Sequence, residues 1–440
     1  MTETIDLLVS LIRNQCVNDG TVSSGHEHRS VETLQAYLDD PGTVFEPAPG
    51  RQSVVYRVKG TDPDAASLML MGHTDVVPAD PSGWSVDPFG GEIAGGFVWG
   101  RGAVDMLNLT ASMATVFRPY LQGEADPLPG DLVFLAVADE ENAGGLGARP
   151  LVADRWDLVH CDNVLTEIAY PPIDTVDGVG YPVAVGEKGP HWTRMVARGT
   201  PGHGSVPYGA DNALAPLVEA LHGLFTTPAL AAITDEWRQF VGATGLDDAL
   251  LDADLVDEAI ERLAATDPRM AAYVHACTHL TVSPNVLTGG VKANMVADWA
   301  EAQVDLRALP GQTRDDVDQF LGKAMGSARD RVELVPVADH PANATPTAGA
   351  LWETIVDALD DVTGSRNAIP TMMPATTDAR FFRRRGVTAY GVGLFDRQVT
   401  FPDFLAMFHG HDERVSVDSV DLTTRLLTVI TQRWRERTSR

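Results

Sequence analysis

Imidazole and carboxylate side chains follow several of the apolar stretches in this sequence. The residues concerned are His73, Asp75, Asp105, Glu140, Glu141, Glu167, His409 and His411. No cysteine accompanies them, and this donor set suits Zn²⁺ in an open, catalytic site, with Co²⁺ or Mn²⁺ as substitutes. Two imidazoles and three carboxylates exceed the ligands of one tetrahedral zinc ion. We therefore expect a pair of metal ions, roughly 3.5 Å apart, that share a bridging carboxylate.

The run LVFLAVADEENAGG, residues 132–145, puts three acids directly after an apolar stretch. Asp139, Glu140 and Glu141 repel one another and resist desolvation at the end of a buried strand, so a positive charge must lie close to them. A solvated acidic turn is the alternative. Neighbouring side chains point apart, so one glutamate can bind a metal ion while the other takes a proton from a water molecule. Divalent metal is the positive charge that we expect here.

His73, Asp75 and Asp105 each have a structural alternative to a role in chemistry. On a strand, Asp75 shares a face with His73, so its carboxylate can fix the tautomer of a metal-binding imidazole. A histidine hydrogen-bonded in a core or loop is the alternative. Asp105 can cap the helix that follows it. Its glycine-rich lead-in, WGRGAVD, instead allows a tight turn from which both carboxylate oxygens reach a cation. No HExxH, nucleophile elbow or P-loop occurs in the sequence.

The elements that would position these residues alternate between helix and strand. We expect helices over residues 2–15, 31–38 and 109–121, and strands over residues 53–58, 67–71 and 132–138. Alternation of this kind predicts an α/β fold, in which a sheet carries helices on its faces. Ligands in such folds gather at the carboxyl ends of the strands, which is where the candidate residues stand.

A Gly- and Pro-rich stretch, GVGYPVAVGEKGPHW at residues 178–192, marks a domain boundary. The chain after it contains a strand, a helix, a mostly helical segment and a further strand, at residues 192–199, 212–224, 226–278 and 294–311. Beyond Thr313 the alternation of helix and strand resumes. We therefore predict a catalytic domain of residues 1–186 and 312–440 that carries an inserted domain of residues 187–311.

The balance of charge excludes several classes of partner. The 440 residues include 61 acids against 33 bases, a net charge of −28. Nucleic acids and anionic membrane surfaces both demand basic patches, so neither is expected. Cys16, Cys161 and Cys277 are too few and too far apart for a disulfide framework, and we expect them to be buried in a reducing compartment. No apolar run approaches ~18 residues and the N-terminus lacks a secretory signal, which predicts a cytoplasmic protein without a membrane span.

Six motifs occur in order along the chain, namely GHTDVVP, GRGAVDM, ADEE, TE, GTPGHGSVP and HGHDERV. Together they resemble the co-catalytic zinc metallopeptidase family that includes aminoacylase, acetylornithine deacetylase, succinyl-diaminopimelate desuccinylase and glutamate carboxypeptidase. The resemblance covers nearly the whole chain. It implies a zinc-peptidase-like catalytic domain with a mixed sheet flanked by helices. It also implies an inserted α+β lid and dimerisation domain, entered at VGEKG, and hence a homodimer.

The resemblance implies a ligand set for two zinc ions. His73 and Glu167 would bind one ion, Glu141 and His409 would bind the other, and Asp105 would bridge the two.

Five further positions match functional residues of the family. Asp75 would orient the first imidazole, and Glu140 would be the general base that activates water and then protonates the leaving amine. His203, in GTPGHGSVP, would reach a neighbouring active site and stabilise the oxyanion. Arg307, in VDLRALPG, would hold a substrate carboxylate, for which a planar bidentate donor is apt. Asn294 would contact polar groups of the substrate. A surface histidine, a strand-end salt bridge and a turn asparagine are the respective alternatives for the last three.

His409 is preferred to His411 as a ligand because the family's histidine stands four residues before an acid, here Glu413. The chain departs from the family at Tyr208, where a second histidine is common, and over residues 373–382, where a glycine-rich loop is replaced by MPATTDARFF. These departures touch no expected metal ligand, and they bear on the substrate.

The function implied is metal-dependent hydrolysis of an amide bond in a small peptide or an N-acyl amino acid with a free carboxylate. A dipeptidase or carboxypeptidase is the alternative within hydrolases. A non-catalytic binding protein that kept the fold is the alternative from another class, and retention of every expected ligand counts against it. A dimetal phosphoesterase is disfavoured because no basic cluster for gripping phosphate stands near the motifs.

Overall fold

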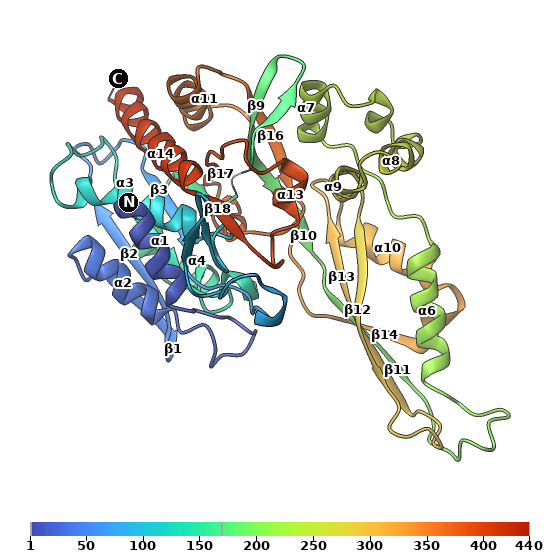
Figure 1. Cartoon of the computed structure of the whole chain (residues 1–440). Coiled ribbons are helices and arrows are strands. Elements are labelled where there is room, and N and C mark those ends of the chain that lie inside the picture. The colour runs from blue at the N-terminus through green and yellow to red at the C-terminus, as the bar shows by residue number, and fades with distance from the viewer. Residues whose placement is uncertain (1, 169, 440) are drawn as a thin grey trace.

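The computed structural model describes residues 2–168 and 170–439. Within them, the largest sheet has ten strands, with β1-β2-β6-β3-β7-β17-β9-β15 side by side and both β8 and β16 paired to β9 (Figure 1). These strands are β1 (Thr43–Ala48), β2 (Arg51–Val58), β3 (Leu68–His73), β6 (Leu132–Val137), β7 (Asn163–Thr166), β8 (Ile173–Thr175), β9 (Gly178–Glu187), β15 (Asn343–Ala344), β16 (Ala368–Met373) and β17 (Thr388–Gly391). The sheet is mixed, as expected from the sequence.

Helices cover both faces of this sheet. One face packs against α1 (Glu3–Arg13), α2 (His28–Leu38), α3 (Leu107–Leu121), α11 (Ala350–Thr363) and α14 (Val417–Thr438). The other packs against α4 (Ala148–Asp154), α5 (Trp156–Val159) and α12 (Ala379–Arg383). Leu68 and Leu70 of β3 face the first group, whereas Met69 and Met71 face the second. This alternation follows from the two-residue period of a strand. The predicted α/β architecture is confirmed, and the expected helices and strands differ from the observed ones by a few residues at their ends.

Three parallel strands bring the candidate residues to one edge. β3 lies between β6 and β7 and runs parallel to both. His73 is the last residue of β3, Glu167 follows β7 directly, and the acidic run begins two residues after β6. Because the carboxyl ends of neighbouring parallel strands meet at the same edge of a sheet, these side chains converge there.

A second sheet projects away from the first (Figure 1). Its strands are β10 (Gly189–Pro190), β11 (Thr193–Arg198), β12 (Thr281–Gly289), β13 (Trp299–Ala308) and β14 (Val332–Pro336). Leu217 of α6 (Leu214–Thr226) and Phe320 of α10 (Arg314–Met325) share a hydrophobic cluster with Met195 of β11. The predicted α+β character of the insertion therefore comes from two helices packed on one antiparallel sheet.

The limits of the inserted unit differ from those expected. α10 and β14 come after residue 311, yet they pack with the second sheet, and β14 pairs with β11 along its length. A boundary at residue 311 would separate them from that sheet, so we propose a boundary after Pro336. The segment 226–278 is helical as predicted, with α7 (Asp235–Thr244), α8 (Val256–Ala264) and α9 (Pro268–Thr278). These three helices share the core of the large sheet, and α7 lies beside β16.

A small third sheet completes the edge that carries the candidate residues. It contains β4 (Glu92–Ala94), β5 (Phe97–Trp99) and β18 (Arg414–Ser416). Pairing of β18 with β5 brings the HGHDERV segment beside the loop that precedes α3. None of the helices described is both long and apolar enough to cross a membrane.

Candidate active site

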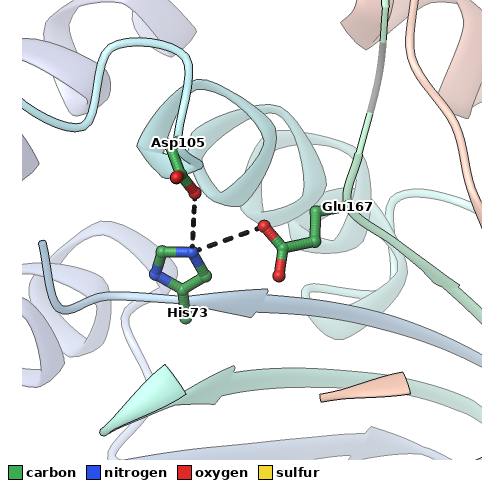
Figure 2. Close-up of side chains that lie close together, drawn as sticks. All are labelled: His73, Asp105 and Glu167. Atoms are coloured by element: carbon green, nitrogen blue, oxygen red, sulfur yellow. Dashed lines mark hydrogen bonds and ion pairs between the residues drawn. The ribbon is translucent and has the colours of Figure 1, made fainter. Parts of the chain in front are cut away.

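Two clusters of imidazole and carboxylate side chains meet at Asp105. In the first cluster, His73 Nε2 lies 3.2 Å from Asp105 Oδ1 and 3.5 Å from Glu167 Oε2 (Figure 2). In the second, His409 Nε2 lies 3.4 Å from Asp105 Oδ2 and 3.1 Å from Glu141 Oε2. Asp105 therefore turns one carboxylate oxygen to each cluster, and it makes no cap for α3.

The residues fit a pair of metal ions. Within each cluster of three, the candidate ligand atoms lie within 4.8 Å of one another. The donors are neutral imidazole and carboxylate, the set used by catalytic zinc and related metals. Glu141 also has its second oxygen, Oε1, buried without a hydrogen-bond partner in the described structure. An orphaned carboxylate oxygen of this kind is explained by a cation. The five expected ligands are therefore together, with Asp105 common to both groups.

Burial and mutual repulsion control the charges in this cluster. Burial and the neighbouring Asp105 raise the pKa of Glu141 to about 7. Burial and the charge of Glu167 raise the pKa of Glu140 well above its usual value. Hydrogen bonds with Asp105 and Glu141 raise the pKa of His409 to about 10. Burial alone would lower the pKa of His73, but Glu167 and Asp105 raise it well above its usual value.

In the chain as described, the carboxylates of Asp105, Glu141 and Glu167 form ion pairs with those two imidazoles only. The site is thus short of positive charge, as expected where divalent metal binds.

Asp75 acts differently from the prediction. His73 Nδ1 lies 2.9 Å from the main-chain oxygen of Asp75 but 3.8 Å from its carboxylate. That carboxylate instead accepts hydrogen bonds from the main-chain N–H groups of Glu140 and Glu141, each at 3.1 Å. The imidazole is therefore oriented by a peptide carbonyl, and the side chain of Asp75 fixes the turn that carries the expected base and one expected ligand.

Asp139, the first acid of the run, is neutralised by an arginine. Arg51 Nη2 lies 2.7 Å from Asp139 Oδ1 and 2.8 Å from Glu27 Oε1, and all three side chains are buried. Asn18 donates from Nδ2 to both Asp139 and Asp75, at 3.0 and 2.9 Å. The expectation that metal neutralises the whole acidic run is therefore wrong for Asp139. No pattern in the sequence identifies Arg51, Glu27 or Asn18 as its partners.

Glu413 positions the segment that carries Asp105, the residue common to both clusters. Its Oε1 accepts hydrogen bonds from the main-chain N–H groups of Val104 and Asp105, at 2.8 and 3.2 Å. Arg101 donates to Oε2 at 2.6 Å. His411, the alternative to His409, packs against Gly83 away from the two clusters. The acid that marked His409 in the sequence is thus a structural partner of Asp105.

A cavity of about 120 Å³ adjoins the clusters, and Arg307 lines it together with Glu140. Its walls also include Pro190 and Trp192 from the second sheet. Asp305 holds the Arg307 guanidinium, with Nε to Oδ1 and Nη2 to Oδ2 both at 3.0 Å. The sequence-predicted Arg307 therefore faces the acids within one chain.

His203 and Asn294 lie away from the clusters. They occupy two loops at the far end of the second sheet, beyond β11 and before β13 (Figure 1), where Gly204 N donates to Asn294 O at 2.8 Å. Arg307 pairs with Pro190 at the near end of β13, whereas Trp299 pairs with Arg198 at the far end. The eight residue-to-residue steps from Trp299 to Arg307 correspond to about 26 Å of strand. His203 is exposed, and neither residue lines the cavity.

Comparison with known proteins identifies the family. The model of peptidase family M20/M25/M40 matches residues 69–433. The chain belongs to this family. It is 26% identical to N-fatty-acyl-amino acid synthase/hydrolase PM20D1 of Xenopus tropicalis over 395 residues, which cover 87% of this chain and 75% of that protein. It is 27% identical to aminoacylase-1 of Sus scrofa over 394 residues, which cover 88% of this chain and 85% of that protein.

The M20 fold is also evident among solved structures. An M20 family metallo-carboxypeptidase, Sso-CP2 from Sulfolobus solfataricus, aligns with a TM-score of 0.74 at 17% identity, covering 99% of this chain and 100% of that one. Family membership confirms the predicted resemblance and the predicted class of enzyme, a metal-dependent hydrolase of amide bonds.

Proposed function

We propose that this M20 enzyme removes the acyl group from an N-acyl amino acid with a free carboxylate, using two zinc ions. The observation that carries the proposal is the sharing of Asp105 between two ligand clusters beside a cavity that also holds Glu140 and Arg307. The similarity to aminoacylase-1 and to an N-fatty-acyl-amino acid hydrolase favours acyl amino acids over dipeptides.

His73, Glu167, Glu141 and His409 would hold the two ions, with Asp105 common to both. When bound, the ions supply Lewis-acid polarisation of the scissile carbonyl and lower the pKa of water.

Glu140 is the general base in this proposal. It lines the cavity beside the ligand clusters, and its main-chain N–H is fixed by Asp75. As a carboxylate it takes a proton from the attacking water, and as a carboxylic acid it returns that proton to the amine that leaves. The turn therefore supplies a base and a ligand from adjacent residues whose side chains diverge.

Arg307 orients the substrate. Its guanidinium is held by Asp305 and lies over the ring of Trp192, with Cζ 5.8 Å from the ring centroid. A fixed, planar cation on the wall opposite the acids can receive the free carboxylate and so place the amide bond between Glu140 and the ligand clusters.

A substrate panel tests the assignment. The zinc-loaded enzyme is assayed on N-acetyl and longer N-acyl amino acids and on matched dipeptides, before and after chelation of the metal. We expect hydrolysis of the acyl amino acids, lost on chelation and restored by zinc. Faster turnover of dipeptides would favour the alternative, a dipeptidase or carboxypeptidase. Hydrolysis of neither class by a zinc-loaded protein would refute the proposal.

The protein is also proposed to work as a homodimer in the cytoplasm. About 26 Å of strand separates the His203 end of the second sheet from the Arg307 end, so His203 would serve the active site of a partner subunit and stabilise the oxyanion there. The three cysteines are free and buried, which suits a reducing compartment.

Subunit mixing tests the role of His203. His203→Ala and Glu140→Ala variants, each inactive alone, are combined under conditions that exchange subunits. Partial recovery of activity is expected, because a mixed dimer contains one site with both residues intact. Absence of recovery after verified exchange would contradict an arrangement in which His203 acts on the partner.

A further inference from the structure

One arginine in the wall of the catalytic cavity has no anionic partner among the described residues. Arg380 on α12 is 2% exposed and lines the cavity that Glu140 and Arg307 also line. Its Nη1 donates to the main-chain oxygen of Thr377 at 2.6 Å. Its Nε is buried with no hydrogen-bond partner in the part of the chain that the structure describes. Burying an unpaired cation costs free energy, so an anion bound at this guanidinium would stabilise it.

Two further arginines, Arg384 and Arg149, act with Arg380 on His340. Arg384 Nη1 lies 3.3 Å from Nδ1 of His340, and the His340 ring packs against Phe381 with 6.3 Å between ring centroids. Burial and the charges of Arg384, Arg380 and Arg149 lower the pKa of His340 to about 4. Three guanidinium groups therefore act on one imidazole at this wall.

None of these three arginines forms an ion pair among the described residues, in a chain with 61 acids and 33 bases. The nearest acid in sequence, Asp378, does not supply the missing charge. It forms no ion pair with Arg380 within the described chain, and burial raises its pKa to about 7. This wall therefore carries a surplus of positive charge in a strongly acidic protein.

The wall is rigid. Thr377 donates from its main-chain N and from Oγ1 to Glu187 Oε2, at 2.6 and 2.7 Å. Arg383 donates to the main-chain oxygen of Ala389. The Arg380 guanidinium lies over the ring of Phe381, 4.3 Å from its centroid. A cation fixed in this way loses little side-chain entropy when an anion binds.

Arg307 and Arg380 differ in the hydrogen-bond partners that their guanidinium groups already have. Arg307 is engaged by both oxygens of Asp305, whereas Arg380 makes one hydrogen bond to a neutral carbonyl. The cavity therefore offers two cationic positions, and the second forms no ion pair within the described part of the chain.

We propose that Arg380, backed by Arg384 and Arg149, binds a second carboxylate of the substrate, carried by the acyl group or by the amino-acid side chain. The inference rests on the proposed function and narrows its substrate class to N-acyl amino acids with two carboxylates. An acidic acyl group and an acidic side chain present the same chemistry, so the test distinguishes them.

Two isosteric substrate pairs provide that test. One pair is N-succinyl-L-alanine and its terminal amide, and the other is N-acetyl-L-glutamate and N-acetyl-L-glutamine. We expect the zinc-loaded enzyme to prefer the acid in one pair by at least about tenfold in kcat/KM, since hydrogen bonds to charged groups contribute that much. The pair that shows the preference identifies which end of the substrate meets Arg380.

Variants then assign the preference to the arginine. Arg380→Gln should reduce the acid-to-amide ratio in that pair to about one, and Arg380→Lys should leave an intermediate ratio, because it keeps the charge and loses the planar donor pair. Arg384→Gln should lower the ratio less. Arg385→Gln is the matched control, since Arg385 donates to Val152 and stacks on Trp156 instead of lining the cavity, and its ratio should equal that of the wild type.

The outcomes separate this inference from the proposed function. No preference for the acid in either wild-type pair would overturn it even if Arg380→Gln fails to fold. An unchanged ratio in a folded Arg380→Gln variant would also overturn it. If no member of either pair is hydrolysed while dipeptides are, the proposed deacylase function fails instead.

Discussion

Adjacent acids of one turn differ in the charge partners that the rest of the chain provides. Asp139 is buried against Arg51 and Asn18 and has its charge matched inside the protein. Glu140 and Glu141 are partly buried, and among the described residues they have no arginine or lysine partner. In this turn, the chain itself neutralises Asp139, which has no proposed role in the chemistry. Within its described part, it leaves Glu140 and Glu141, the proposed base and metal ligand, without a basic side chain of that kind.

The same contrast appears in how the charge of each acid is compensated. A buried carboxylate that loses its partner costs several kcal/mol, so the ion pair with Arg51 offsets the burial of Asp139. Glu141 avoids part of that cost by a raised pKa of about 7 and by its contact with His409. Asp75 joins the two sides, since its carboxylate accepts from Glu140 and Glu141 and from the amide of Asn18.

Replacing Glu140 should give the largest effect. We expect Glu140→Ala to lower kcat by ~10²–10⁴-fold or more, because the proton of the attacking water then has no acceptor. Bound metal should be unchanged, and elemental analysis checks this alongside the assay. Asn142→Ala, an exposed position in the same turn, is the control and should keep its activity. A near-normal kcat for Glu140→Ala would exclude its role as base.

Replacing Arg51 should lower the free energy of unfolding, because Arg51 neutralises Asp139 and Glu27. Arg51→Met leaves Glu27 and Asp139 buried without a cation and should cost about 3–5 kcal/mol of unfolding free energy, measured by urea denaturation of the metal-free protein. Arg366→Met, which breaks an exposed pair with Asp357, should cost about 0–1 kcal/mol. Equal costs for the two variants would show that the Asp139 network is not what stabilises the turn.

Asn18 donates hydrogen bonds to both Asp75 and Asp139, so its replacement should affect both the metal site and the buried network of Asp139. Asn18→Ala leaves one hydrogen bond unmade at Asp75 and another at Asp139, which should cost about 1–3 kcal/mol of stability. Metal affinity should fall by about tenfold, since groups that hold ligands in place contribute at that level. Titration with zinc measures the second effect. Loss of stability at unchanged zinc affinity would show that Asn18 supports the buried network of Asp139 and not the metal ligands.

Release of protons when metal binds to the two clusters is the smallest of the expected effects. The pKa of His409 is raised to about 10 and that of His73 is raised well above its usual value, which favours the protonated form of both imidazoles in the metal-free protein. A bound metal displaces these protons, so affinity should rise with pH. Calorimetry in buffers of different ionisation enthalpy should detect release of at least one proton per chain. Metal binding without proton release would contradict these raised values.

The same pKa shift fixes how the metal-free protein responds to pH. A histidine whose pKa is higher in the folded than in the unfolded state stabilises the fold below its unfolded value of about 6.5. For His409 that contribution is lost as pH rises toward about 10.

The sequence predicted the ligands better than their supports. His73, Asp105, Glu141, Glu167 and His409 stand in motifs shared with a known family, and that resemblance was enough to group them as candidate ligands. Their supports come from distant segments. Arg51 lies on β2 and Glu27 before α2, and nothing local to either residue indicates a contact with Asp139. The carboxylate of Asp75 was expected on an imidazole because strand alternation does not describe the turn beyond the strand.

The fold was predicted where elements are buried and missed where they lie at an edge. β12 was not expected, since most of its residues are exposed and Pro284 interrupts its pattern. α10 and β14, which we propose to include in the inserted unit, were placed outside it because their packing partners, α6 and β11, stand far earlier in the chain.

Metal content of an Asp105→Asn variant tests the central claim most directly. Because Asp105 belongs to both ligand clusters, the wild type should retain two zinc ions per chain after dialysis against metal-free buffer. The variant should retain fewer than one, while its circular dichroism stays that of the wild type. A wild type that binds a single ion, or a folded variant that keeps both, would contradict the account.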